Sequence, residues 1–212
     1  MLKIIAAISL ILLYVPANTL AQSNVYIDVL AAWNKGNNDV MKVVIIDKAN
    51  TTDEKLAIVN KVLLSKESFS NSNGKFFVGW QGALEQLNSK SLPTKFIISY
   101  SDKPIKDGIT IELLSVVNPH YVGYATPKYD DKKIISAKIN MYDVPNLSDE
   151  QFENILRHEI GHALGLGHAE ITESLMYPIV DSTPKYISSC ELSALKAISD
   201  GVSFQMVECY SA

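Results

Sequence analysis

Cysteine, histidine and clusters of positive charge are scarce in this sequence. Its 212 residues include two cysteines and four histidines, and 19 lysines and arginines are outnumbered by 23 acidic residues. Because no run of basic residues stands out, nucleic acid and acidic membrane surfaces are poor candidates for partners. The chain also shows no internal repeat or low-complexity tract. With 47% hydrophobic and 20% charged residues, it has the composition of one globular domain.

The N-terminal apolar run is too short to cross a bilayer. It covers residues 4–15 and follows a single lysine, whereas a spanning helix needs about 20 residues. Small residues after the run offer a cleavage site, which is typical of a secretory signal peptide. We therefore expect residues 1–21 to be removed, by cleavage after Ala21 or after Ala17. Residues 22–212 are then expected to form a single secreted domain.

The two cysteines, Cys190 and Cys209, both lie near the C-terminus. Export would place them in an oxidising environment, which permits a disulfide. Such a bond would stabilise the fold by about 3 kcal/mol through loop entropy. The alternative is a pair of buried free thiols.

The spacing of apolar residues predicts an irregular order of strands and helices. The β-branched run Val40–Asp47 indicates a buried strand. Apolar residues at helical spacing follow Thr51, which makes a capping box with Glu54, and the polar stretch Ser65–Gly74 indicates a loop. A helix is expected around Trp80–Leu87, and further strands at Lys95–Tyr100, Gly108–Leu114, His120–Pro127 and Lys133–Tyr142, the last two as antiparallel neighbours. Without regular alternation, this order favours an α+β fold.

A helix with clear start and stop signals follows these strands. Ser148 can cap its start together with Gln151, and Gly165 should end it, because glycine accepts the left-handed conformation. His158 and His162 are four residues apart on this helix, so their imidazoles share one face. Two nitrogens in this arrangement can bind one Zn²⁺.

Glu159 and His168 complete a pattern that indicates a catalytic metal site. In the H-E-x-x-H arrangement, the glutamate is placed to act as a general base. A catalytic zinc takes three protein ligands and keeps one open position. Gly165 and Gly167 would let the chain turn back sharply, so that His168 becomes the third ligand. We therefore predict one catalytic zinc, bound by His158, His162 and His168.

The same stretch resembles the metzincin metalloproteases. "HEIGHALGLGH" fits their H-E-x-x-H-x-x-G-x-x-H pattern, and "SLMYP" is similar to their Met-turn, with Met176 eight residues after His168. Within this clan, "HALGLGH" and "LMYP" are most similar to the matrixins, the matrix-metalloprotease-like group (peptidase M10). Ala169 departs from them, since matrixins often have serine there. The likeness extends to "AAWNK" before the first buried strand, similar to a Trp-led first strand, and to "VGYATP", similar to a strand at the edge of the cleft.

This resemblance implies a fold and further site residues. The expected fold is an α+β zincin-like domain with a twisted, mostly parallel five-stranded sheet, three main helices and a small irregular C-terminal subdomain. Met176 would form a packed floor under the zinc. Gly123, Tyr124 and Ala125 would pair with an extended substrate, and Pro178 would form part of the wall beside the scissile bond.

Three features of this sequence depart from known metal and latency patterns. Both cysteines follow the histidine motif, so a cysteine that caps the zinc from a pro-segment is not expected. His120 is the single histidine before the motif, and we interpret it as structural or exposed. Asp130 and Asp131 could bind Ca²⁺, but the regular acidic spacing of a calcium loop is missing, so most such pairs are solvated turn residues.

The sequence thus predicts a secreted, monomeric zinc endopeptidase. A water bound to zinc and activated by Glu159 would hydrolyse peptide bonds of a protein or peptide substrate. One alternative is a secreted zinc-binding interaction module on the same fold without proteolysis. Another is a structural or adhesive protein in which the histidines are incidental.

Overall fold

The structure is a computed structural model that describes residues 25–34, 39–87, 89, 92–179 and 185–209. The signal peptide expected at residues 1–21 lies outside the described residues and stays a prediction. Within the described ranges, no helix is both long and apolar enough to cross a membrane.

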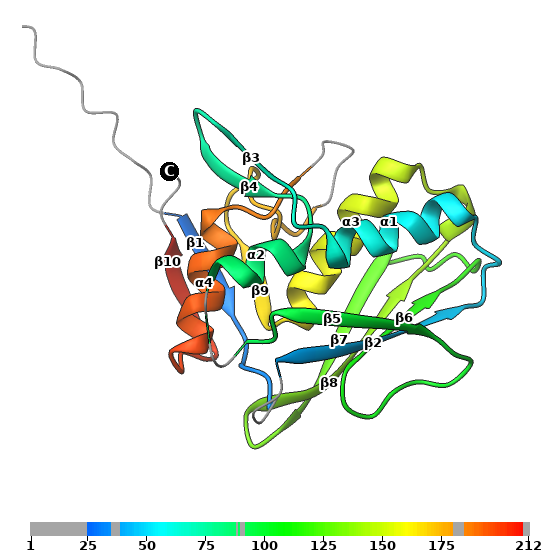
Figure 1. The fold of residues 1–212 in the computed structure, drawn as a ribbon, viewed down its shortest axis with the longest axis horizontal. Helices are drawn as coiled ribbons and strands as arrows, with labels where there is room; N and C mark the ends of the chain where they lie inside the picture. Colours follow the sequence, from blue (N-terminus) through cyan, green and yellow to red (C-terminus); the bar gives the residue numbers. More distant parts are fainter. Residues whose placement is uncertain (1–24, 35–38, 88, 90–91, 180–184, 210–212) are drawn as a thin grey trace, which may run out of the picture.

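A twisted five-stranded sheet forms the larger part of the molecule (Figure 1). Its strands lie in the order β5 (Lys95–Tyr100), β2 (Val40–Asp47), β6 (Ile109–Leu113), β8 (Lys133–Met141) and β7 (Gly123–Asp130). The first four are parallel, whereas β7 runs antiparallel to β8. This order confirms the predicted mostly parallel sheet. It also leaves β7 as an edge strand of the described sheet.

Two helices, α1 (Asp53–Leu64) and α3 (Asp149–Ala163), pack together on one face of this sheet (Figure 1). The 3₁₀ helix η1 (Val144–Asn146) leads from β8 into α3. The third main helix is α4 (Ser189–Ser199), and a shorter helix, α2 (Trp80–Leu87), packs against α1 and α4. The α+β class and its three main helices are therefore confirmed, with α2 as a short addition.

Alternation along the strands explains the core between the sheet and the helices. On β2, Met41, Val43 and Ile45 are buried in the main core, as expected for every second residue of a strand. On α3, Phe152 and Leu156 are four residues apart and fully buried in the same core. These contacts fix α3, and hence its histidines, against the sheet.

A second sheet, with the strand order β10–β1–β9, lies beside the main one (Figure 1). It is built from β1 (Val25–Val29), β9 (Leu166–Ala169) and β10 (Gln205–Cys209), and all its pairings are antiparallel. Trp33, which resembled the lead residue of the first strand, instead follows β1. Its indole N–H donates to the Ala163 carbonyl at 2.8 Å, which ties this segment to the end of α3.

Two local predictions are wrong. The predicted loop Ser65–Gly74 contains a hairpin of β3 (Ser68–Asn71) and β4 (Gly74–Phe77). All four residues of β3 are exposed, so the strand lacks the alternation that would reveal it. The cap of α1 is Thr52 and not Thr51, because the Thr51 hydroxyl donates to Asp47.

The β7–β8 hairpin was predicted with its boundaries shifted. β7 begins at Gly123 rather than at His120 and continues to Asp130, so the turn is formed by Asp131 and Lys132. Both have positive φ, 42° and 61°, as a tight hairpin turn requires. Asp130 and Asp131 belong to no group of three or more metal-binding side chains among the described residues, and the calcium role that the sequence did not favour stays untested.

Cys190, in the first turn of α4, is buried and disulfide-bonded. The sequence has one other cysteine, Cys209 at the end of β10. Its side chain lies outside what the structure describes, so the Cys190–Cys209 pairing stays a prediction.

Candidate metal centre

The capping box at the start of α3 forms as predicted. The Gln151 N–H donates to the Ser148 hydroxyl at 3.2 Å, and the Ser148 N–H donates to the Gln151 side chain at 3.0 Å. Two turns later the helix presents His158 and His162 side by side, with ring centroids 4.6 Å apart. Their common face follows from the four-residue spacing.

The chain reverses at Gly165 and returns as β9. Gly165 has a φ of +105°, and a Cβ there would clash with the Ala31 carbonyl. This turn brings His168 within 5.6 Å of His158 and 4.8 Å of His162, measured between ring centroids. Gly167 has a different role from the one predicted. Its backbone is not left-handed, but a Cβ on it would meet the Cβ of Asp28, so glycine there permits close pairing of β9 with β1.

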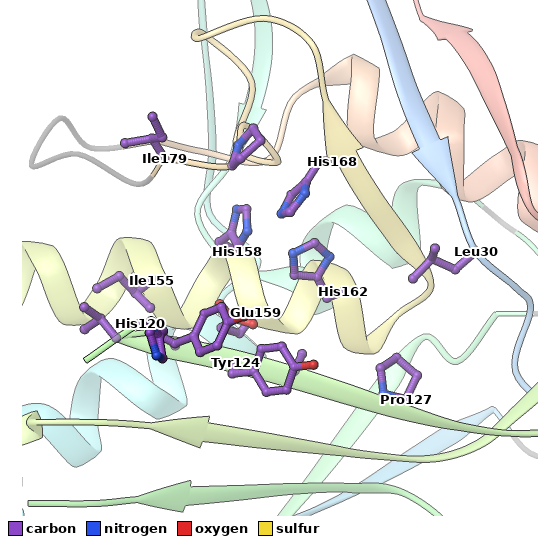
Figure 2. A pocket seen from close by; sticks show the side chains of 15 residues that line it. Leu30, His120, Tyr124, Pro127, Ile155, His158, Glu159, His162, His168 and Ile179 are labelled. Carbon is purple, nitrogen blue, oxygen red and sulfur yellow. The ribbon is translucent and has the colours of Figure 1, made fainter. Parts of the chain in front are cut away.

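The three imidazoles fit one metal ion. A ligand nitrogen of each lies within 4.8 Å of the others, and three imidazoles are a known ligand set of catalytic zinc. The Nδ1–H of His158 donates to the Leu175 carbonyl at 2.7 Å, and that of His162 donates to the Leu166 carbonyl at 2.9 Å. These bonds leave both Nε2 lone pairs free, which is the arrangement usual for zinc-binding histidines. Figure 2 shows the three rings converging.

Burial keeps these histidines neutral. It lowers the pKa of His158 to about 4 and that of His162 to about 3, and the neighbouring histidines act in the same direction. Burial also lowers the pKa of His168. Since only neutral imidazole binds a metal, the three histidines can bind a cation at neutral pH without first losing protons.

Glu159 lies beneath the histidines, between α3 and β7 (Figure 2). Burial raises the pKa of its carboxyl to about 8, although the Ala125 N–H donates to it and acts in the opposite direction. Its Oε2 atom is buried and has no hydrogen-bond partner. Gly123 makes this approach possible, because a Cβ there would lie 2.7 Å from Glu159 Oε1. One carboxylate oxygen is thus left without a hydrogen-bond partner next to the histidines.

Met176 packs against α3 next to the histidine segment, and its role as a floor under the zinc stays a prediction. It is fully buried, and a Cβ on Gly161 of α3 would clash with its sulfur. Its carbonyl accepts the Ala169 N–H at 2.9 Å, which joins the turn to the strand that carries His168.

Sequence reasoning missed two buried charged residues that fix this region. Glu191 of α4 accepts the Ser174 hydroxyl at 2.7 Å and the Leu175 N–H at 3.1 Å, and the carbonyl of that same Leu175 holds His158. Arg157 donates to the Val78 and Lys185 carbonyls at 3.0 and 2.8 Å. Ser188 and Glu191 do form the S-x-x-E capping signal, but that signal predicts a helix start and not a contact with a distant turn.

A cavity of about 500 Å³ opens over the site. The four residues predicted to contact substrate, Gly123, Tyr124, Ala125 and Pro178, all line it together with Glu159 and the three histidines. The sequence did not indicate that Leu30, Pro127, Ile155 and Ile179 also line it. His120 also lines the cavity and is exposed.

Comparison with protein families identifies a relationship for this chain. A search of curated proteins found no significant relative. The family model described as Matrixin matches residues 16–198, which include the three histidines, Glu159 and the turn at Met176. Matrixins are zinc metallopeptidases and are typically extracellular. Because the match covers most of the sequence, the chain belongs to the matrixin family.

Proposed function

We propose that this chain is a secreted, monomeric, zinc-dependent endopeptidase with a single zinc. One observation carries the proposal. Three neutral imidazoles and Glu159 line the same cavity, and the Oε2 atom of this glutamate is buried without a hydrogen-bond partner. A buried carboxylate oxygen without a hydrogen-bond partner costs free energy, so its placement beside a ligand set supports a chemical role.

The histidines would hold the zinc, with His158 and His162 oriented by the Leu175 and Leu166 carbonyls. Bound there, the zinc supplies a Lewis acid that polarises a peptide carbonyl and acidifies a water. Since the ligands lie on a helix end and a short strand fixed by packing, their geometry is largely pre-organised.

Glu159 would move the proton. A positive charge beside it lowers the pKa of its carboxyl, so the ionised form becomes available at neutral pH. Its Oε2 then accepts a proton from the attacking water as the new C–O bond forms at the scissile carbonyl. The same oxygen delivers that proton to the leaving nitrogen as the C–N bond breaks, which balances the hydrolysis.

The free edge of β7 would bind the substrate. An extended peptide can add as a further strand to an exposed sheet edge through backbone hydrogen bonds. Along this edge, Gly123 and Ala125 give the peptide close access to Glu159, because neither has a side chain longer than a methyl group. Pro178 would form the wall of the pocket on the opposite side of the cavity.

The test is digestion of a peptide library by the purified chain loaded with zinc. We expect cleavage that a chelator abolishes and added zinc restores. Glu159→Gln should bind zinc with unchanged stoichiometry and lose at least about a thousandfold in kcat, because the proton acceptor is gone. A chain that binds one zinc yet cleaves no peptide would instead be the zinc-binding module. N-terminal sequencing of exported protein tests the signal peptide, and its mass in solution tests the monomer.

A further inference from the structure

An exposed aromatic pair lies beyond one end of the cavity. Tyr129, near the end of β7, and Phe204, just before β10, have ring centroids 5.9 Å apart. They are 39% and 56% exposed. The two residues are 75 positions apart in the sequence, so their contact is a product of the tertiary fold.

Phe204 occupies an unfavourable position for its residue type. Its φ is +51°, a left-handed conformation that a bulky residue rarely adopts and that costs of the order of 1 kcal/mol. Its large apolar ring also stays mostly in water. Neither property stabilises the fold, and an observed backbone outlier of this kind is a reason to look for a function.

The pair is continuous with the cavity. The Phe204 N–H donates to the Leu30 carbonyl at 2.9 Å, and Leu30 lines the cavity. On β7, Pro127 also lines it and lies two residues before Tyr129, with an irregularity in the β7–β8 pairing between Lys128 and Tyr129. A peptide paired with the free edge of β7 would therefore pass from Glu159 to the aromatic pair.

We propose that Tyr129 and Phe204 form a remote subsite that binds an apolar side chain of the extended substrate. Ala125, whose N–H donates to Glu159, marks the reacting centre, and Tyr129 follows four residues later. At about 3.3 Å per residue, this places the apolar side chain about four residues from the scissile bond. The subsite rests on the proposed function, and it uses a residue that follows the family-matched range 16–198.

Peptide binding to zinc-loaded Glu159→Gln tests the subsite without cleavage. The probes are otherwise identical peptides of about 12 residues, long enough to span the cavity and the aromatic pair, with one leucine or one serine scanned along the chain. We expect one leucine position, about four residues from the position nearest Glu159, to bind about tenfold tighter than serine there. We call the ratio of these two affinities the leucine contrast. Phe204→Asn, which suits a left-handed backbone, and Tyr129→Ser should each reduce the leucine contrast to below about threefold.

Ile97→Asn is the matched control, since Ile97 is 58% exposed on β5 at the opposite edge of the sheet. It should leave the leucine contrast unchanged. A contrast that is absent, or that survives both Phe204→Asn and Tyr129→Ser, overturns the subsite. Failure of the unmutated chain to cleave any peptide would overturn the endopeptidase instead, because the binding measurement does not depend on cleavage.

Discussion

At the scale of single residues, the site depends on buried polar groups whose partners come from distant parts of the chain. Glu191 is fully buried, and it holds the Leu175 peptide whose carbonyl orients His158. A hydrogen bond to a metal-binding histidine fixes both its ring orientation and its tautomer. Glu191 is therefore a positioning residue for the metal centre, although it touches neither metal nor substrate.

Replacing this carboxylate should weaken zinc binding. For Glu191→Ala we expect a loss of zinc affinity of about 10- to 100-fold, because the Leu175 peptide loses its anchor. Competition with a chromophoric chelator measures the zinc affinity of each protein. Glu54→Ala, an exposed residue of α1, is the control and should bind zinc normally. An unchanged zinc affinity in a folded Glu191→Ala protein would exclude the positioning role.

Glu159 also gives the metal-free protein a distinctive pH dependence. Its pKa is raised from 4.5 to about 8 in the folded state, so between these values the folded state holds a proton that the unfolded state has lost. The contribution of Glu159 to the free energy of unfolding therefore falls as pH rises from about 5 to 8, whereas the buried histidines, with their lowered pKa values, contribute in the opposite direction up to about pH 6.5.

Glu159→Gln removes this titration. Relative to the unmutated metal-free chain, the free energy of unfolding of the variant should increase by about 2–4 kcal/mol between pH 5 and pH 8. Denaturant unfolding at several pH values measures the difference. If the free energies of unfolding of the two proteins differ by the same amount at every pH in this range, the raised pKa of Glu159 is contradicted.

At the scale of elements, the third histidine depends on how closely β9 approaches β1. Gly165 permits the reversal after α3, and Gly167 permits β9 to lie against Asp28. The two glycines thus act differently, one through its backbone conformation and the other through its missing side chain.

Adding a methyl group at this contact should displace His168. For Gly167→Ala we expect a destabilisation of about 1–3 kcal/mol and a measurable loss of zinc affinity, because the new Cβ would overlap that of Asp28. Gly201→Ala is the control, because it adds backbone strain without displacing a neighbour. Gly201 has a φ of +98° and free space around it. That variant should lose stability and keep its zinc affinity. Equal zinc affinities for the two variants would refute the displacement.

At the scale of the whole molecule, the C-terminal part is held by a small second sheet and a disulfide. β10 pairs with β1 along five residues, and Cys190 in α4 is disulfide-bonded. Since α4 also carries Glu191, this part of the chain supports the turn beneath the metal centre.

Mass spectrometry of a non-reduced digest should show one peptide containing Cys190 linked to Cys209. Reduction should then lower the free energy of unfolding by about 3 kcal/mol, as expected for closing a loop of this length. Thermal unfolding with and without reductant measures the change, and Cys190→Ser with Cys209→Ser should be insensitive to reductant. Free thiols in the exported protein would contradict the linkage.

Much of the candidate site could be predicted because its determinants are local. The cap at Ser148, the histidines four residues apart and the stop at Gly165 all lie within one short segment. The hairpin β3–β4 could not be predicted, because the four side chains of β3 are all exposed and give no alternation. The role of Gly167 was misjudged, because its cause is a contact with Asp28, almost 140 residues earlier.

The sequence by itself determined the helix α3, the buried strands and the set of metal-binding side chains, since backbone periodicity and capping act over a few residues. The tertiary structure alone decided which distant segments meet. It placed β1 between β9 and β10, Glu191 against Leu175, and Phe204 beside Tyr129. These contacts join residues up to 184 positions apart, and they follow from burial of the whole chain rather than from any local pattern.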